Sequence, residues 1–299
     1  MCQGKGKIVT LSLGGDNKNN PGPITFSSDA QAEQFADTVW NLFLGGSSPS
    51  GRPFGNAVLD GIDLNLEGDV PSTGYVAFVN RIRSHADGAS KKYYVTAAPQ
   101  CPYPDKTLKP ILDGASFDAV YVQFYNNRQC EVSSDGINFD EWDQWAKTVS
   151  PNKNVRVFLG APASPDAAVE GYVDANTLGK LANRIKDQYS SFGGVMLWDA
   201  SQADANGRYD VAIKKALTGE TGVDSFPDTS ATAQSTSAAS LGSTAASSAQ
   251  PSSRVTEAAS TSESSVVASA SSSSISDKSA DNAHDGETRP QKASRFIRL

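Results

Sequence analysis

The stretch Leu59-Asp60-Gly61-Ile62-Asp63-Leu64-Asn65-Leu66-Glu67 alternates between aliphatic and polar residues from Ile62 onward. A period of two is typical of a β-strand, so one face of this strand carries acidic and amide groups and the other carries aliphatic groups. A strand face lined with acids is costly to bury unless it opens onto a cavity. We therefore expect a functional site at the C-terminal end of this strand.

Two other interpretations fit parts of the same stretch. Asp63-x-Asn65-x-Glu67-Gly68 resembles the start of a calcium-binding loop, but the twelfth position is Gly74 where such loops have Glu, and a calcium loop has no reason to alternate with Ile and Leu. An edge strand with a solvated polar face would also alternate. The glycines at positions 61 and 68, each next to an acidic residue, fit an α/β unit better.

The spacing Asp60-x-x-Asp63-x-Asn65-x-Glu67 resembles the DxxDxDxE signature of glycoside hydrolase family 18, the chitinases, with Asn in place of the usual middle Asp. Further stretches resemble the plant and fungal class III, hevamine-like branch of that family, and the likeness runs in order from about Cys2 to Leu217. These stretches are Leu11-Ser12-Leu13-Gly14-Gly15, Ala97-Ala98-Pro99-Gln100-Cys101-Pro102, Tyr121-Val122-Gln123-Phe124-Tyr125-Asn126-Asn127 and Gly193-Gly194-Val195-Met196-Leu197-Trp198.

Composition divides the 299 residues near position 219. All four Trp and all nine Tyr precede that point, whereas residues 220–299 are rich in Ser, Thr and Ala. Such a segment cannot bury a core, so we predict a catalytic domain over residues 1–219 and a disordered tail over 220–299. The tail resembles the O-glycosylated stalks that follow many fungal catalytic domains; the alternative is a flexible tail without a function. The net charge of −7 gives no electrostatic reason to expect nucleic acid as a partner.

Strand-like and helix-like segments alternate along residues 1–219, which predicts a parallel sheet wrapped by helices. The expected strands are 7–13, 62–66, 93–97, 119–124, 155–159 and 195–198, and the expected helices are 29–43 (capped by Ser27 or Ser28), 75–84, 107–113, 138–149, 176–189 and 211–217. The fold class is therefore α/β.

The resemblance implies a (β/α)8 barrel of the TIM type, which has eight strand-helix units. Six units are visible here. By the resemblance, the two missing units are those that family members carry before the position of Cys2. A barrel without its first two units would expose two sheet edges and open its interior. We expect the chain to be poorly stable as written, or its true start to lie upstream of Met1.

Glu67 is the last acidic residue of its strand, where a general acid for a glycosidic oxygen belongs. Asp63 lies about 13 Å back along the strand. Retaining enzymes need a second carboxylate about 5–5.5 Å away, and inverting enzymes need one about 6.5–9.5 Å away. The resemblance implies another nucleophile, the N-acetyl carbonyl of the substrate itself, and so a chitinase acting on internal β-1,4 bonds between N-acetylglucosamine units.

The resemblance also implies roles for other residues. Asp63 tunes proton transfer, Asn65 holds the substrate acetamide without the usual negative charge, and Tyr125 donates a hydrogen bond to the acetamide oxygen. A weak or inactive chitin-binding or inhibitor-like pseudoenzyme is the alternative, because losing one preorganised charge costs about 10²–10³ in rate. The expected substrate-binding residues are Gln100, Gln123, Asn126, Met196 and Trp198.

Cys101 and Cys130 could pair, and the resemblance implies that they do and that Cys2 lacks its usual upstream partner. His85 and His284 are the only histidines, and neither fits a zinc motif or a Ser-His triad, so we expect no metal and no cofactor. No apolar run is long enough to span a membrane and no signal peptide is visible. The resemblance nevertheless implies a secreted or cell-wall protein, and we expect a monomer.

Overall fold

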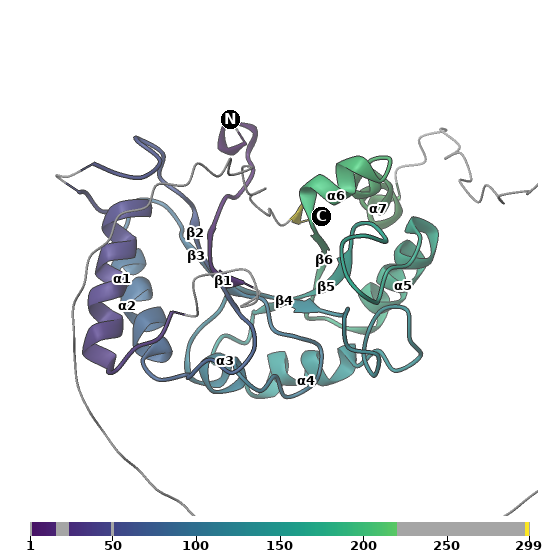
Figure 1. Cartoon of the computed structure of the whole chain (residues 1–299), viewed down its shortest axis with the longest axis horizontal. Helices are drawn as coiled ribbons and strands as arrows, with labels where there is room; N and C mark the ends of the chain where they lie inside the picture. Colours follow the sequence, from purple (N-terminus) through teal and green to yellow (C-terminus); the bar gives the residue numbers. More distant parts are fainter. Residues whose placement is uncertain (1, 16–23, 49–50, 220–296, 299) are drawn as a thin grey trace, which may run out of the picture. The chain divides into compact units, whose positions relative to one another are not determined.

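The computed structural model describes residues 2–15, 24–48 and 51–219, together with the backbone of residues 297–298. Strand and helix alternate along the chain (Figure 1). The elements in order are η1 (Gln3–Lys5), β1 (Leu11–Gly15), α1 (Asp29–Phe43), β2 (Gly61–Leu66), α2 (Tyr75–Asp87), β3 (Tyr94–Ala97), α3 (Lys109–Gly114), β4 (Ala119–Gln123), α4 (Phe139–Thr148), β5 (Arg156–Pro162), α5 (Ala175–Gln188), β6 (Phe192–Trp198), α6 (Ala200–Ala205), α7 (Tyr209–Thr218) and β7 (Ile297–Arg298).

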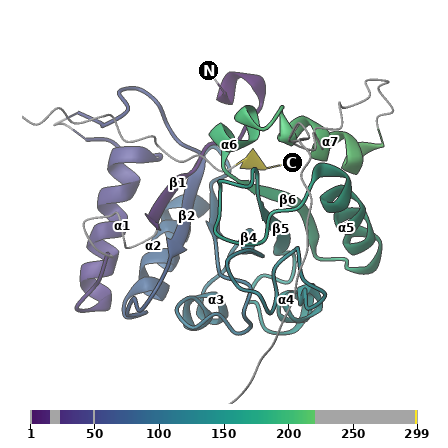
Figure 2. The same cartoon turned by 45° about the vertical axis from the view of Figure 1, so that its right-hand side comes forward.

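The strands form one sheet in the order of the sequence, β1 to β7. Strands β1 to β6 are parallel, and the short β7 pairs antiparallel with β6 near the C terminus (Figure 2). The register places Ser12 of β1 and Thr96 of β3 on either side of Asp63 in β2. The predicted α/β class, with six β/α units of the barrel type, is confirmed, and β1 forms an edge of the sheet rather than pairing with β6 or β7.

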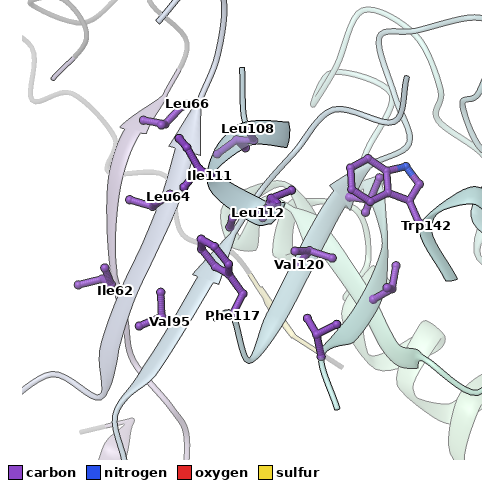
Figure 3. Close-up of a cluster of buried hydrophobic side chains, with 14 of the residues drawn as sticks. Ile62, Leu64, Leu66, Val95, Leu108, Ile111, Leu112, Phe117, Val120 and Trp142 are labelled. Atoms are coloured by element: carbon purple, nitrogen blue, oxygen red, sulfur yellow. The ribbon is translucent and has the colours of Figure 1, made fainter. Parts of the chain in front are cut away.

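The aliphatic half of the alternation in β2 faces the helices. Ile62, Leu64 and Leu66 are at most 3% exposed and pack in the cluster that contains side chains of α3 and α4 (Figure 3). Burying one such side chain stabilises the folded state by about 1.5–3 kcal/mol. This apolar face holds β2 in register, because a slip by one residue would turn Asp63 and Asn65 into the core.

Two local expectations were wrong. The strand expected over residues 7–13 as a buried element begins only at Leu11 and alternates between half-buried and exposed residues, because β1 is an edge strand covered on one side. Before it, the N–H of Val9 binds the side chain of Asp60. Helix α6 was not predicted, since its six residues are too few to show a helical period; Asp199 caps it by accepting from the N–H groups of Ser201 and Gln202.

Most other boundaries lie within two residues of the prediction, but β5 ends three residues later, β6 begins three residues earlier and α2 ends three residues later than predicted. Helix α1 spans Asp29–Phe43 as predicted, and Ser28 is its cap, since the Ser28 hydroxyl accepts from the N–H of Gln31. The predicted tail over 220–299 lies outside the described residues except for 297–298. Within the described part of the chain, none of the helices has both the length and the apolar character that a membrane crossing requires.

Candidate active site

The polar half of the alternation in β2 lies on the face opposite to the helices. Asp63 and Asn65 are 2% and 5% exposed, whereas Glu67 follows the end of β2 and is half-buried. The backbones of β1 and β2 lie close together at Gly14, where a Cβ atom would be 2.2 Å from the backbone carbonyl oxygen of Asn65. Only glycine fits there, since φ is +99° as well.

Hydroxyl groups from both neighbouring strands bind Asp63. The Ser12 hydroxyl donates to Oδ2 at 2.8 Å, and the Thr96 hydroxyl donates to Oδ1 at 2.6 Å. A carboxylate buried this deeply needs such partners. Thr96 was not among the predicted site residues, although it belongs to the same period-two pattern in β3 that places Val95 and Ala97 in the core.

The side-chain amide of Gln123 connects the strands on the far side of Asn65. Its Nε2 atom donates to the carbonyl oxygen of Ala98 at 2.9 Å and to Oδ1 of Asn65 at 3.2 Å, and it lies 3.5 Å from Oε1 of Glu67. Gln123 is 5% exposed. The structure therefore brings together Asn65, Glu67 and Gln123. The side-chain oxygen of Asn65, rather than its Nδ2 group, faces Gln123.

Tyr125 lies in a small aromatic cluster on the same side of the sheet. The cluster contains Tyr121, Tyr125 and Met196, and the half-buried Trp198 packs against it. Burial raises the pKa of the Tyr125 phenol well above its ordinary value, and the negative charge of Glu67 raises it further. The Tyr125 phenol is therefore protonated at neutral pH and can donate a hydrogen bond.

Two other predicted binding residues have structural partners. Oδ1 of Asn126 accepts from the N–H groups of Val169 and Glu170, which holds the loop after β5 beside Tyr125. Gln100 is half-buried after β3 and forms an isolated β-bridge with Gln123.

A disulfide bond joins Cys101 to Cys130, as the resemblance implied, and Cys2 is an exposed free thiol. This disulfide bond connects the loop after β3 to the loop after β4. The carbonyl oxygen of Cys101 also accepts hydrogen bonds from Asn138 and from the indole of Trp142. The loops after β3 and after β4, which begin near Gln123 and Tyr125, are thus fixed to α4.

Asp60, the first acid of the signature, lies at the opposite end of β2 from Glu67. Its carboxylate accepts from Gln3 and from the N–H of Val9, and it pairs with Lys91 at 2.9 Å. Burial alone would raise the pKa of Asp60, but these hydrogen bonds and the Lys91 charge outweigh it and lower the pKa. Asp60 ties the segment before β1 to the sheet and does not belong to the candidate site.

A cavity of about 560 Å³ opens at the N-terminal ends of β3, β4 and β5. Tyr94, Tyr121, Arg156 and Phe158 are among the residues that line it. It lies at the other end of the strands from Glu67, so it does not contain the predicted catalytic carboxylate. Across residues 2–15, 24–48 and 51–219, no three or more His, Cys, Asp and Glu side chains are grouped so as to hold a metal ion.

Comparison with known proteins assigns most of the described chain to a family. Residues 2–177 match the family described as Glycosyl hydrolases family 18. The chain is 53% identical over 209 residues to Chitinase 2 of Rhizopus oligosporus, which covers 70% of this chain and 37% of that protein. It is 45% identical over 229 residues to the Class III chitinase of Arthroderma benhamiae, which covers 72% of this chain and 67% of that protein.

Solved structures show the same fold. The ICChI chitinase of Ipomoea carnea superposes with a TM-score of 0.63 and 33% identity, over 72% of this chain and 75% of that one. The xylanase-alpha-amylase inhibitor protein XAIP-I superposes with a TM-score of 0.62 and 37% identity, over 73% of this chain and 76% of that one. The chain spans less than two fifths of the length of several fungal relatives that it matches.

Proposed function

Because the chain belongs to glycosyl hydrolase family 18, we propose that it hydrolyses internal β-1,4 bonds between N-acetylglucosamine units of chitin, with retention of configuration and with the substrate's own acetamide as nucleophile. The observation that carries this proposal is the position of Glu67, a half-buried carboxylate at the carboxyl end of β2, beside Tyr125 and Gln123. Proteins named as chitinases among its relatives support the substrate class.

In this mechanism Glu67 first protonates the glycosidic oxygen and then, as a carboxylate, activates water. The Tyr125 phenol stays protonated and donates to the acetamide oxygen as that oxygen attacks the anomeric carbon. Asp63, which accepts hydrogen bonds from the hydroxyls of Ser12 and Thr96 on the same strand face, tunes the proton transfer by Glu67. The half-buried Trp198 offers apolar surface beneath the sugar ring, whereas Met196 is fully buried and belongs to the cluster against which Trp198 packs.

Asn65 has the weakest fit to this chemistry. Its carbonyl oxygen already accepts from Gln123, so the acetamide nitrogen of a substrate would share that acceptor. Asn65 also has no charge to offset the developing cation of the intermediate. We therefore propose a slow enzyme, with a rate about 10²–10³ below that of the same site with a carboxylate.

The test is hydrolysis of a fluorogenic chito-oligosaccharide by the full chain, beside the variants Asn65→Asp and Glu67→Gln. We expect slow turnover by the native chain, faster turnover by Asn65→Asp and no turnover by Glu67→Gln. Turnover that survives Glu67→Gln would refute the assignment of the acid. A folded native chain and Asn65→Asp variant that neither hydrolyse nor bind chito-oligosaccharides would refute the proposal as a whole.

The second candidate is a chitin-binding or inhibitor-like pseudoenzyme. The neutral Asn65 between Asp63 and Glu67 favours it, and a protein of similar fold is described as a xylanase-alpha-amylase inhibitor. Retention on chitin together with no turnover, even by Asn65→Asp, would establish this candidate. For either function we propose a monomer that acts outside the cell or in its wall, where chitin is met and where a disulfide such as Cys101–Cys130 persists.

A further inference from the structure

The loop after β3 reaches the residue that follows Glu67. The Thr107 hydroxyl donates to the carbonyl oxygen of Gly68 at 2.5 Å, and the same carbonyl accepts from the N–H of Val70 at 3.1 Å. Gly68 has a φ of +78°, in the left-handed region that favours glycine. The chain therefore leaves β2 through a turn whose geometry is fixed directly after Glu67.

Thr107 is itself held in place by a buried carboxylate. Oδ1 of Asp105 accepts from the N–H groups of Thr107 and Leu108 at 2.9 and 2.6 Å, and Oδ2 accepts from the N–H of Gln100 at 2.9 Å. Asp105 and Thr107 are 7% and 8% exposed. One side chain thus organises the backbone from Gln100 to Leu108 and directs the Thr107 hydroxyl at Gly68.

The same loop is anchored at its beginning by Cys101, through the disulfide to Cys130 and through the hydrogen bonds that its carbonyl accepts. A second contact joins the two loops at the surface, an ion pair between Lys106 and Asp69 whose side chains are 85% and 83% exposed. Exposed pairs of this kind contribute little. Gly68 is exposed as well, but the Thr107 side chain that donates to it is only 8% exposed and is itself held by Asp105. The Thr107 hydrogen bond is therefore the contact that can fix the end of β2.

We propose that Thr107 is a positioning residue for Glu67. Through the carbonyl of Gly68 its hydroxyl holds the backbone of the strand end, and so the Glu67 carboxylate, in the position required for proton transfer. This inference rests on the proposed role of Glu67 as general acid. Displacement of a catalytic group by about 1 Å costs about 10²-fold in rate, so a single hydrogen bond at this point has a measurable effect.

The variants that test it are Thr107→Val, Thr107→Ser and Lys106→Ala. Thr107→Val keeps the shape of the side chain and removes the hydroxyl, Thr107→Ser restores the hydroxyl, and Lys106→Ala breaks the exposed ion pair between the same loops without touching Gly68. We expect kcat on chitotetraose to fall about 10- to 100-fold in Thr107→Val with KM nearly unchanged, and to stay close to the native value in the other two. An unchanged kcat in Thr107→Val, or an equal loss in Thr107→Ser or Lys106→Ala, would overturn the inference.

A measurement without turnover separates this inference from the proposed function. Amide exchange and 15N chemical shifts of residues 67–70 report the end of β2 whether or not the protein is an enzyme. Thr107→Val is expected to shift these signals and speed their exchange, whereas Lys106→Ala leaves them near the native positions. If neither the native chain nor Asn65→Asp hydrolyses or binds chito-oligosaccharides, the proposed function fails, but this measurement still decides whether Thr107 holds the strand end. A native-like spectrum in Thr107→Val would refute that role of Thr107.

Discussion

Replacing Asp105 with alanine removes the acceptor of three backbone N–H groups, those of Gln100, Thr107 and Leu108. A hydrogen bond to a charged group contributes about 1.5–3 kcal/mol, so simple addition would give about 4.5–9 kcal/mol. The three hydrogen bonds belong to one network, so their contributions do not add in full. We therefore expect the free energy of unfolding to fall by about 3–5 kcal/mol.

Asp105→Asn is expected to lower the free energy of unfolding by only part of that amount. One amide oxygen can still accept two of the hydrogen bonds, but the NH₂ group then faces the remaining backbone N–H, so we expect a loss of about 1.5–3 kcal/mol. The assay is equilibrium unfolding in urea, followed by tryptophan fluorescence, with an unchanged m-value as the sign that only stability has changed. Asp69→Asn is the matched control, because Asp69 is 83% exposed and its loss is expected to cost less than about 0.5 kcal/mol.

The reasoning about Asp105 would be refuted by an alanine variant within about 1 kcal/mol of the native chain. It would also be refuted if Asp105→Asn and Asp105→Ala were equally destabilised, since the partial effect of asparagine follows directly from the two oxygens serving different N–H groups.

Three further predictions concern pH, the candidate site and the covalent crosslink. Hydrogen bonds from Arg81 and then His85 lower the pKa of Asp37, so its carboxylate stabilises the fold above about pH 4 and loses this effect as the pH falls through the folded pKa; because its side chain is 38% exposed, Asp37→Asn should cost under about 1 kcal/mol at pH 7 in urea unfolding. Tyr125→Phe should lower kcat about 10²-fold with thermal stability nearly unchanged, since the ring stays packed and only the donor is lost. Replacing Cys101 and Cys130 together with serine should cost about 3.5 kcal/mol, from a sequence separation of 29.

Each of these has an outcome that contradicts it. For Asp37→Asn it is a stability difference that grows as the pH falls below 4. For Tyr125→Phe it is a full retention of kcat, or a loss of activity that only accompanies unfolding. For the cysteine pair it is an unchanged midpoint of unfolding under oxidising conditions, with the native chain treated identically.

Much of the fold could be predicted because it depends on patterns within short segments. The period of two in residues 62–67 separates an aliphatic face from a polar face, and the packing of Ile62, Leu64 and Leu66 in the apolar core follows from it. It does not predict that Asp63 and Asn65 are buried too, because their burial depends on partners from other strands. Helix α1 was predicted to the residue, since its cap and its apolar spacing are both local. The beginning of β1 was predicted wrongly, because the burial of an edge strand depends on which strands lie beside it.

The sequence alone therefore determined the alternation of strands and helices, the acidic face of β2 and, by resemblance, the family. Only the tertiary structure decided what each acid contacts. Thr96 and Asp63 are 33 positions apart, and Gln123 and Asn65 are 58 apart, yet parallel register brings each pair into hydrogen-bond distance. The fold of the loop after β3 likewise places Thr107 on Gly68, a contact 39 residues apart that no local pattern encodes.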